Sequence, residues 1–155
     1  MLITARAKDA KSRYAGVAGQ AQSTDLRNWE ILQPLSANGS GFANLEVLQF
    51  AEVDGVGVVV FCCGWREYDD ELLSRFGKTD YTFSVPCASL SKGIDLSKAR
   101  PFIHEELYAG RLVQKPTGEW FLIGFVNFRE GKFVGELSDP IPVTADPEMG
   151  LQIRS

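Results

Sequence analysis

The sequence predicts an all-β protein built from antiparallel, four-stranded meanders. Three observations lead to this prediction. The apolar runs are short, rich in Val, Ile and Phe, and separated by residues that favour turns. Glycine is abundant, at 15 residues, and several glycines stand where a hairpin needs a positive φ. One group of segments also recurs along the chain at a fixed spacing.

The individual elements follow from the apolar runs and the turns between them. Asp54-Gly55, residues 116–119 and Glu130-Gly131 each place a glycine between two apolar segments, which favours a hairpin. Only residues 69–76 have helical spacing, with acidic residues at their start, so we expect one short helix within a long loop. The ten expected strands cover residues 2–7, 14–23, 29–34, 45–52, 56–63, 81–89, 107–114, 120–127, 132–137 and 141–144.

The internal repeat indicates how these strands are grouped. The segments L-E-V-L-Q-F at Leu45 and V-V-V-F at Val58 recur as L-Y-A-G-R-L-V at Leu107 and W-F-L-I-G-F at Trp120, and both pairs start 62 residues apart. A period of about 60 residues that carries a four-stranded meander is typical of a β-propeller blade. We therefore expect a single partial propeller domain of about two and a half blades. The half blade covers residues 1–34, and the full blades cover 45–103 and 104–155.

Length and composition exclude several classes of protein. The 155 residues are 45% hydrophobic, which is enough apolar material for one folded domain and excludes a disordered chain. The net charge of -4 leaves no basic stripe for a nucleic-acid partner. The longest uncharged apolar run, residues 55–65, is far shorter than the roughly 20 residues of a membrane helix. Because the N-terminus also lacks the order of a signal peptide, we expect no membrane association and a cytoplasmic protein.

The three cysteines do not indicate a special chemistry. Cys62 and Cys63 are adjacent, the total is odd, and the spacing to Cys87 matches neither a disulfide framework nor a zinc site. Buried thiols within strands are the expected outcome. The sequence accordingly predicts no metal site and no cofactor.

Several segments together carry a resemblance to a known family. The run S-T-D-L-R-N-W-E at Ser23 resembles the S-x-D-L-x-x-W signature that closes blades in one clan, and L-E-V-L-Q at Leu45 resembles the strand with its E-C or E-V-P motif. The segments at Leu107, Glu119 and Gly135 (G-E-L-S-D-P-I-P-V) resemble the strands that follow. In this order, over nearly the whole chain, they are similar to the five-bladed β-propeller glycoside hydrolases of family 32 and its relatives, which act on sucrose and fructans.

The resemblance implies a role for one residue and marks two departures. Glu46 matches the general acid/base Glu of the family. The family's nucleophilic Asp, in a W-M-N-D-P-N-G type motif, and its transition-state-stabilising Asp, in an R-D-P motif, have no counterpart in this sequence. Hydrolysis of a glycosidic bond normally needs two carboxyl groups. The chain is therefore expected to resemble the C-terminal portion of such an enzyme, with the acid/base Glu kept and the nucleophile lacking.

Two functions from different classes remain open at this point. The first is a fructosidase-like glycoside hydrolase that acts on sucrose or fructan-type sugars only after assembly with another chain. The second is a non-catalytic sugar-binding or degenerate propeller fragment, which the missing motifs favour. As a third possibility, the chain is a separately expressed piece of a longer gene product. A carbohydrate ligand is expected in both functions, and the sequence does not decide whether the single chain is an enzyme.

The surroundings of Glu46 define the expected site. Glu46 interrupts an apolar stretch, where an ionised carboxylate is costly unless it lines a polar channel or is paired. In a four-stranded meander, the loop over residues 63–80 returns to the face that Glu46 points into. This loop holds aromatic side chains that suit the apolar face of a sugar and polar ones that suit its hydroxyls. The expected sugar-binding residues of the loop are Trp65, Arg66, Tyr68 and Asp69.

Three further residues complete the predicted site. His104 precedes the inner strand of the second full blade, and Tyr108 and Arg111 lie on that strand, so all three are expected to bind substrate in or near the axial channel. His104 is the only histidine, and a lone histidine without a nucleophile signature is more often structural than catalytic. By the same topological argument, residues 8–13 and 127–130 belong to this face.

Counting strands leads to an expected partner. Ten strands at four per blade give two and a half blades, which leaves an open sheet edge and uncovered apolar faces. Two copies supply the strands of one five-bladed ring, so we expect a homodimer that completes the propeller around a two-fold axis. A dimer of chains that lie side by side is the alternative arrangement.

Overall fold

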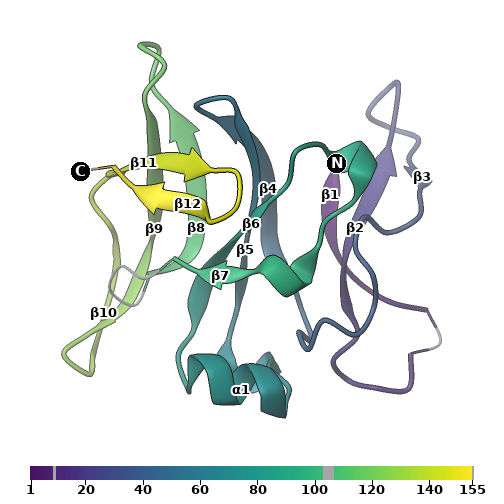
Figure 1. Cartoon of the computed structure of the whole chain (residues 1–155), viewed down its shortest axis with the longest axis horizontal. Coiled ribbons are helices and arrows are strands. Elements are labelled where there is room, and N and C mark those ends of the chain that lie inside the picture. The colour runs from purple at the N-terminus through teal and green to yellow at the C-terminus, as the bar shows by residue number, and fades with distance from the viewer. Residues whose placement is uncertain (9, 103–106, 155) are drawn as a thin grey trace.

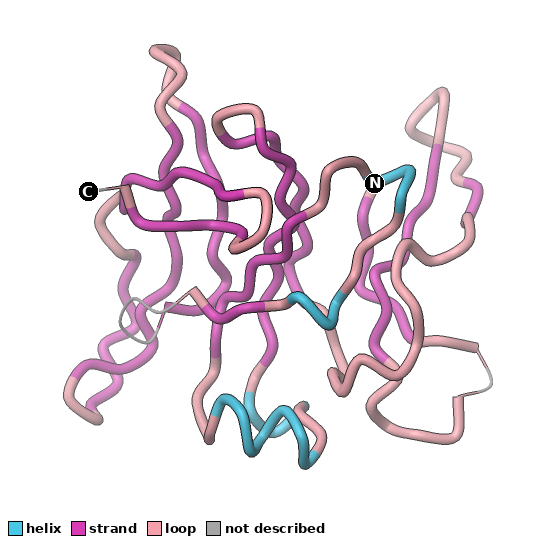
Figure 2. Tube along the Cα trace, in the orientation of Figure 1, coloured by secondary structure: helices cyan, strands magenta, loops and turns pink. Residues whose placement is uncertain are grey.

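The computed structural model describes residues 1–8, 10–102 and 107–154. The fold is all-β, and its three antiparallel sheets lie side by side in chain order, from right to left in Figure 1. Strands are the main regular element of the trace in Figure 2, and the helical segments are short. Within the described residues, no helix is both long and apolar enough to cross a bilayer. The predicted fold class is confirmed.

The first sheet has the strand order β1-β2-β3. The amide of Gly16, where β2 begins, donates to the carbonyl of Phe42 at 2.9 Å, so β2 begins near the end of the molecule where β4 begins. Because β1 and β2 are antiparallel, β1 also runs antiparallel to β4 and occupies the second position of a blade, outside the innermost one. The strands are β1 (Leu2–Arg6), β2 (Gly16–Gln22) and β3 (Glu30–Ile31).

The second sheet is a four-stranded meander, as predicted, with the order β4-β5-β6-β7. Its long connection carries the predicted helix α1 (Asp70–Phe76), which Asp69 caps by accepting a hydrogen bond from the amide of Leu72. Three short 3-10 turns, η1 (Trp65–Glu67), η2 (Leu90–Lys92) and η3 (Leu96–Lys98), complete the connections. The strands are β4 (Glu46–Val53), β5 (Val56–Cys63), β6 (Tyr81–Pro86) and β7 (Arg100–Pro101).

The third sheet has an interrupted third position. Strand β9 pairs with β8 along one edge, while β10 pairs with the end of β9 and β11 with its beginning along the other. Between β10 and β11, Ser138 takes over the pairing: its amide donates to the carbonyl of Gly124, and its hydroxyl accepts from the Gly124 amide. The strands are β8 (Leu107–Gln114), β9 (Trp120–Arg129), β10 (Lys132–Leu137), β11 (Ile141–Asp146) and β12 (Gly150–Ile153).

Short strands account for the main differences from the predicted elements. The strand expected at residues 29–34 contains only Glu30–Ile31, and neither β7 nor β12 was expected. Segments of two to four residues are too short for an alternating apolar pattern to be recognised. The described part of the chain therefore holds twelve strands, whereas the sequence predicted ten.

Two hydrophobic cores fill the spaces between neighbouring sheets. In the first core, the rings of Phe42, Phe61 and Phe83 lie with their centroids 5.1–5.2 Å apart. In the second core, Val58 and Val60 of β5 pack with apolar side chains of β8 and β9. Alternate residues of β5 thus enter different cores, and β4 pairs with this largely buried strand.

The pairing register defines the internal repeat more closely than the sequence does. Glu46 pairs with Cys62 in the second sheet, and Tyr108, 62 residues further on, pairs with Phe125 in the third. The inner strands therefore repeat with the predicted spacing, but the spacing between β5 and β9 is one residue longer. The predicted equivalence of Trp120 with Val58 is wrong by that one residue, because the β8–β9 turn is longer than the β4–β5 turn.

The corrected register identifies an apolar face on the third sheet. Val58 and Val60, which are fully buried in the second core, correspond to Phe121 and Ile123. These two side chains lie on the face of the third sheet that points away from the second. Leu137 and Val113 on the same face are 74% and 41% exposed. The third sheet thus leaves partly exposed the positions that the second sheet buries, and Lys115 lies over the Phe121 ring at 4.2 Å.

Candidate functional site

The contact between Glu46 and Tyr108 is the centre of the candidate site. Glu46 is the first residue of the edge strand β4 and Tyr108 the second residue of the edge strand β8, and both are half-buried. The Tyr108 hydroxyl donates a hydrogen bond of 2.5 Å to Glu46 Oε2. Burial, and then the hydrogen bond to Glu46, raise the pKa of Tyr108 well above its usual range. The pair is therefore a carboxylate that accepts from a phenol that stays protonated.

A β-bulge directly follows Glu46. The register passes from the Glu46–Cys62 pair to the Gln49–Val60 pair, so that two residues, Val47 and Leu48, lie opposite Phe61 alone. Val47 has a φ of 50°, in the left-handed region that a β-branched residue strongly disfavours. Such a conformation costs about 1–3 kcal/mol and persists only where the surrounding structure enforces it.

The bulge determines which way Glu46 points. Leu45 and Leu48 both belong to the first core, although residues three apart on a regular strand face opposite sides. Without the extra residue, Glu46 would share the face of Leu48 and its carboxylate would enter the apolar core beside Phe61. With the bulge, Glu46 leaves that face and reaches Tyr108 of the neighbouring sheet. The extra residue therefore turns a buried charge into a paired, partly accessible one.

A second bulge occupies the same place in the third sheet. Ala109, 62 residues after Val47, has a φ of 52°, and the pairing of β8 with β9 shifts between Tyr108 and Arg111. Thr82 of the second sheet holds this bulge: its hydroxyl donates to the Leu107 carbonyl at 3.1 Å and accepts from the Gly110 amide at 3.2 Å. A Cβ atom at Gly110 would lie 2.7 Å from the Thr82 methyl group, so glycine is needed there.

Two side chains tie the inner strands β4 and β8 together. Arg111 Nη1 donates to the carbonyls of Val47 at 3.1 Å and Leu48 at 3.3 Å, the two residues of the first bulge. The side-chain amide of Gln49 donates to the Leu112 carbonyl and accepts from the Leu112 amide, both at 2.9 Å. Arg111, which we expected to bind substrate, thus lies beside Glu46 but directs a guanidinium nitrogen at protein carbonyls.

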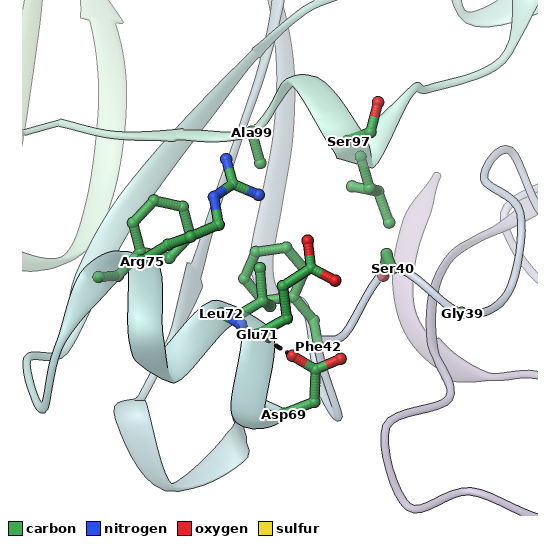
Figure 3. A pocket seen from close by; sticks show the side chains of 11 residues that line it. Gly39, Ser40, Phe42, Asp69, Glu71, Leu72, Arg75, Ser97 and Ala99 are labelled. Carbon is green, nitrogen blue, oxygen red and sulfur yellow. Dashed lines mark hydrogen bonds between the residues drawn. The ribbon is translucent and has the colours of Figure 1, made fainter.

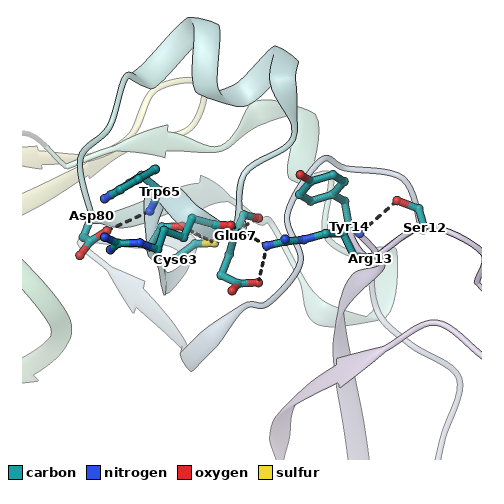
Figure 4. Close-up of polar contacts among 9 residues, drawn as sticks. Ser12, Arg13, Tyr14, Cys63, Trp65, Glu67 and Asp80 are labelled. Carbon is teal, nitrogen blue, oxygen red and sulfur yellow. Dashed lines mark hydrogen bonds and ion pairs between the residues drawn. The ribbon is translucent and has the colours of Figure 1, made fainter.

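The loop that follows β5 begins at the end of the sheet where Glu46 lies, because Glu46 pairs with Cys62. Within this loop the Trp65 amide donates to Asp80 Oδ1 at 2.9 Å, and the Arg66 guanidinium lies over the Trp65 ring at 4.4 Å. Figure 4 shows Arg13 reaching the same segment, where Nη2 donates to the Arg66 carbonyl at 2.6 Å. Trp65 and Arg66 therefore stack on each other at the rim of this face.

Tyr68 and Asp69 make contacts that stabilise the loop. Tyr68 is 3% exposed, and its hydroxyl lies 3.0 Å from the Cys63 carbonyl and 3.1 Å from that of Thr79. Burial raises the pKa of Tyr68 well above its usual range. Asp69 caps α1 through the Leu72 amide. The remaining predicted site residue, His104, lies outside the described residues.

The small cavities on this side of the molecule are lined by loop residues. One of about 130 Å³ is lined by Trp65, Lys78, Thr79, Asp80, Asn127 and Phe128, which brings the end of β9 beside the loop. A second, of about 150 Å³ and shown in Figure 3, lies between α1 and η3, with Asp69, Glu71 and Arg75 at its wall. Both are smaller than the roughly 300–1,000 Å³ typical of ligand pockets. Glu46 and Tyr108 line neither of them.

Metal and thiol chemistry have no candidate centre in residues 1–8, 10–102 and 107–154. In these ranges, no three His, Cys, Asp or Glu side chains gather as a metal ion would require. Cys62, Cys63 and Cys87 are free and buried, as predicted. Burial raises the pKa of the Cys63 thiol to about 12, so the reactive thiolate is strongly disfavoured there.

Comparison with solved structures identifies the architecture. The chain superposes on a family 32 β-fructofuranosidase from Bombyx mori with a TM-score of 0.73, at 17% identity over 99% of this chain and 33% of that one. It superposes on sucrose-6-phosphate hydrolase from Lactobacillus gasseri (TM-score 0.64, 17% identity, 97% and 32% coverage) and on kestose-bound inulosucrase from Halalkalicoccus jeotgali (0.68, 18%, 98% and 45%). The chain folds as part of such a propeller. The resemblance drawn from the sequence is confirmed at the level of the fold.

The comparisons also define the extent of the match. The chain spans about a third of the length of the β-fructofuranosidase and of the hydrolase, and under half of that of the inulosucrase. No protein-family model matches this sequence, and no curated protein matches it significantly. The shared fold, together with the Glu46–Tyr108 pair, is therefore the basis for the functional proposal.

Sequence reasoning missed the residues that hold the bulges. Val47 and Gln49 lie in the L-E-V-L-Q segment and Thr82 lies in β6, but their roles depend on backbone conformation and on contacts between sheets that no motif reveals. One available signal was the repeat itself, since its spacing of 62 residues aligns Glu46 with Tyr108. Two polar side chains at one position of successive inner strands indicate a shared channel surface.

Replacing Tyr108 by phenylalanine tests the electrostatics of the pair. The pKa of Tyr108 is higher in the folded than in the unfolded state, so its protonated phenol stabilises the fold. This contribution is fully present below the unfolded pKa of about 10 and is lost as the pH rises toward and through the folded pKa. We expect Tyr108→Phe to lower the free energy of unfolding at pH 7 by about 1–3 kcal/mol, because Glu46 loses its donor. Urea unfolding from pH 7 to 11 should also give a shallower decline above pH 10 than in the wild type.

Glu46→Gln serves as the matched variant for this titration. It removes the charge that helps to keep the Tyr108 phenol protonated while keeping a side chain of similar size. The decline above pH 10 should therefore also become shallower. Identical pH profiles for the wild type and both variants would contradict this description of the pair.

Proposed function

We propose that this chain is a carbohydrate-active propeller segment of the family 32 type, acting on or binding sucrose and fructan-type sugars in the cytoplasm. The observation that carries the proposal is the Glu46 carboxylate, which a bulge presents at the inner strands of a fold shared with sucrose- and fructan-related enzymes. The proposed unit is one partial propeller domain, with a half blade at 1–34 and blades at 45–103 and 104–155. Its ligand is a carbohydrate.

Glu46 is proposed to hold the general acid/base position. A half-buried carboxyl group with one hydrogen-bond donor is suited to exchanging a proton with a glycosidic oxygen. Tyr108, whose phenol stays protonated, orients one carboxylate oxygen and leaves the other for the sugar. In this proposal Trp65 supplies an aromatic surface at the rim, once Arg66 and Lys78 move from its ring.

The proposed chemistry is incomplete within the single chain. The sequence contains neither the W-M-N-D-P-N-G nor the R-D-P motif, and a retaining or an inverting hydrolase uses a second carboxyl group within about 5–10 Å of the first. This absence favours the second candidate function, a non-catalytic sugar-binding fragment. Under both candidates, the purified chain is expected to turn over sucrose, levan and inulin negligibly.

Sugar titration tests whether the proposed site binds carbohydrate, which both candidate functions require. Sucrose, fructose and kestose are added to the protein while tryptophan fluorescence is recorded, with Glu46→Gln and Trp65→Ala as variants. We expect binding at millimolar concentration that Glu46→Gln weakens about tenfold, since a charge-assisted hydrogen bond to the ligand is lost. Exposed Trp29 is the matched control, and Trp29→Ala should leave the affinity unchanged.

Hydrolysis measurements complete this test. Turnover that survives purification and disappears in Glu46→Gln would show that a second carboxylate of this chain acts with Glu46, and would overturn the non-catalytic function. If none of the three sugars perturbs the signal and both variants behave like the wild type, the proposed site does not bind carbohydrate.

We also propose that two copies associate through the outward face of the third sheet. Twelve strands are described in place of the ten expected, so counting strands no longer favours a ring closed by two copies. The apolar face with Phe121, Ile123 and the exposed Leu137 instead supports the side-by-side arrangement. Its positions correspond to those that the second sheet buries against the third, and such faces pack well against another sheet.

Sedimentation equilibrium tests this association. At micromolar concentration we expect twice the chain mass of 17.1 kDa. Val113→Lys combined with Leu137→Lys should shift the protein to the monomer, because both side chains are exposed on the proposed face and tolerate the change in the isolated fold. Met149→Lys, on the β11–β12 turn, is the control that should stay dimeric. A stable monomer of the wild type would contradict the proposed association.

A further inference from the structure

The first bulge leaves backbone groups that the sheet itself does not pair. Between the Glu46–Cys62 and Gln49–Val60 pairs, the ladder of β4 and β5 is interrupted at Val47 and Leu48. β4 is also an edge strand, so carbonyls on its free side have no partner within the sheet. Arg111 supplies one from β8, 64 and 63 residues away in the chain, with one nitrogen that donates to both carbonyls.

The strained residue and the supporting contact coincide. Val47 has the left-handed φ of 50°, and its own carbonyl is one of the two acceptors of Arg111. A β-branched residue keeps such a conformation only when surrounding contacts enforce it. Since the bulge sets the direction of Glu46, a contact that holds the bulge also holds the carboxylate in place.

The second bulge is held in a similar way, by a side chain of the neighbouring sheet. The second bulge, at Ala109, is held by Thr82 of the preceding sheet through the Leu107 carbonyl and the Gly110 amide. Each bulge is thus held by a side chain of the neighbouring sheet, and the site residue of each bulge, Glu46 or Tyr108, immediately precedes the left-handed residue.

From this geometry we infer that Arg111 is a positioning residue for Glu46, acting through the left-handed bulge at Val47. Its guanidinium fixes the backbone that directs Glu46 to Tyr108 and does not contact the sugar. That Arg111 thereby affects sugar chemistry rests on the proposed function. The positioning of Glu46 by Arg111 concerns only the conformation of the free protein. It replaces the substrate-binding role that the sequence suggested for Arg111.

Nuclear magnetic resonance of the isotope-labelled full chain tests the inference without any sugar. Two signals are read: the strong intraresidue NOE between amide and α proton that a positive φ produces at Val47, and the exchange-protected hydroxyl proton of Tyr108, assigned by its loss in Tyr108→Phe. In Arg111→Met both signals should be lost, while the amide resonances of the first core stay in place. Arg111→Lys should keep both, because one donating nitrogen suffices for the two carbonyls. The exposed Arg27 provides the matched control, Arg27→Met, which should change neither signal.

A second variant separates positioning from general stability. Glycine adopts a positive φ without strain, so Val47→Gly should restore the Tyr108 hydroxyl signal in the Arg111→Met background. Persistence of both signals in Arg111→Met, or a double variant that fails to regain the Tyr108 signal or fails to fold, would overturn the inference. If the inference holds and the sugar titration shows no binding, only the proposed function fails; if sugar binds but Arg111→Met leaves both signals intact, only the positioning role fails.

Discussion

The extra residue in β4 is the constraint on which the candidate site depends. A carboxylate on an edge strand that packs against an apolar core has only one acceptable direction, which is out of the core and toward a donor. The left-handed turn at Val47 provides this direction by shifting the alternation of side chains by one position. Leu45 and Leu48 thereby stay in one core, while Glu46 between them leaves it.

The cost of this turn is met by contacts between sheets. Arg111 and Gln49 link β8 to β4, and Thr82 links β6 to the bulge in β8. None of these contacts is possible within one blade, so the Glu46–Tyr108 pair forms only when two blades are packed together. The aromatic core around Phe61 and Phe83 holds the central sheet against which this packing occurs. The site is in this sense a property of the interface between neighbouring blades.

Sequence patterns predicted those features that are local or that repeat. Alternation, turn residues and the 62-residue period gave the all-β class, most strands, the helix capped by Asp69 and the position of Glu46 on an inner strand. They did not predict the bulges, because a left-handed valine has no sequence signature of the kind that Gly or Asn provides. The same limit applies to Tyr68, whose burial under the loop follows from aromatic packing with Phe42 and Phe83 and not from spacing. The register of β9, one residue from its predicted place, follows from the length of the β8–β9 turn, which alternation in β9 alone does not reveal.

The direction of Glu46 is the central claim, and NOE spectroscopy of the folded chain measures it most directly. The bulged strand predicts NOEs between the γ-methylene protons of Glu46 and the ring protons of Tyr108, and none between Glu46 and the ring of Phe61. A regular strand predicts the reverse, with Glu46 on the face of Leu48 beside Phe61. NOEs from Glu46 to Phe61 in place of Tyr108 would contradict the account.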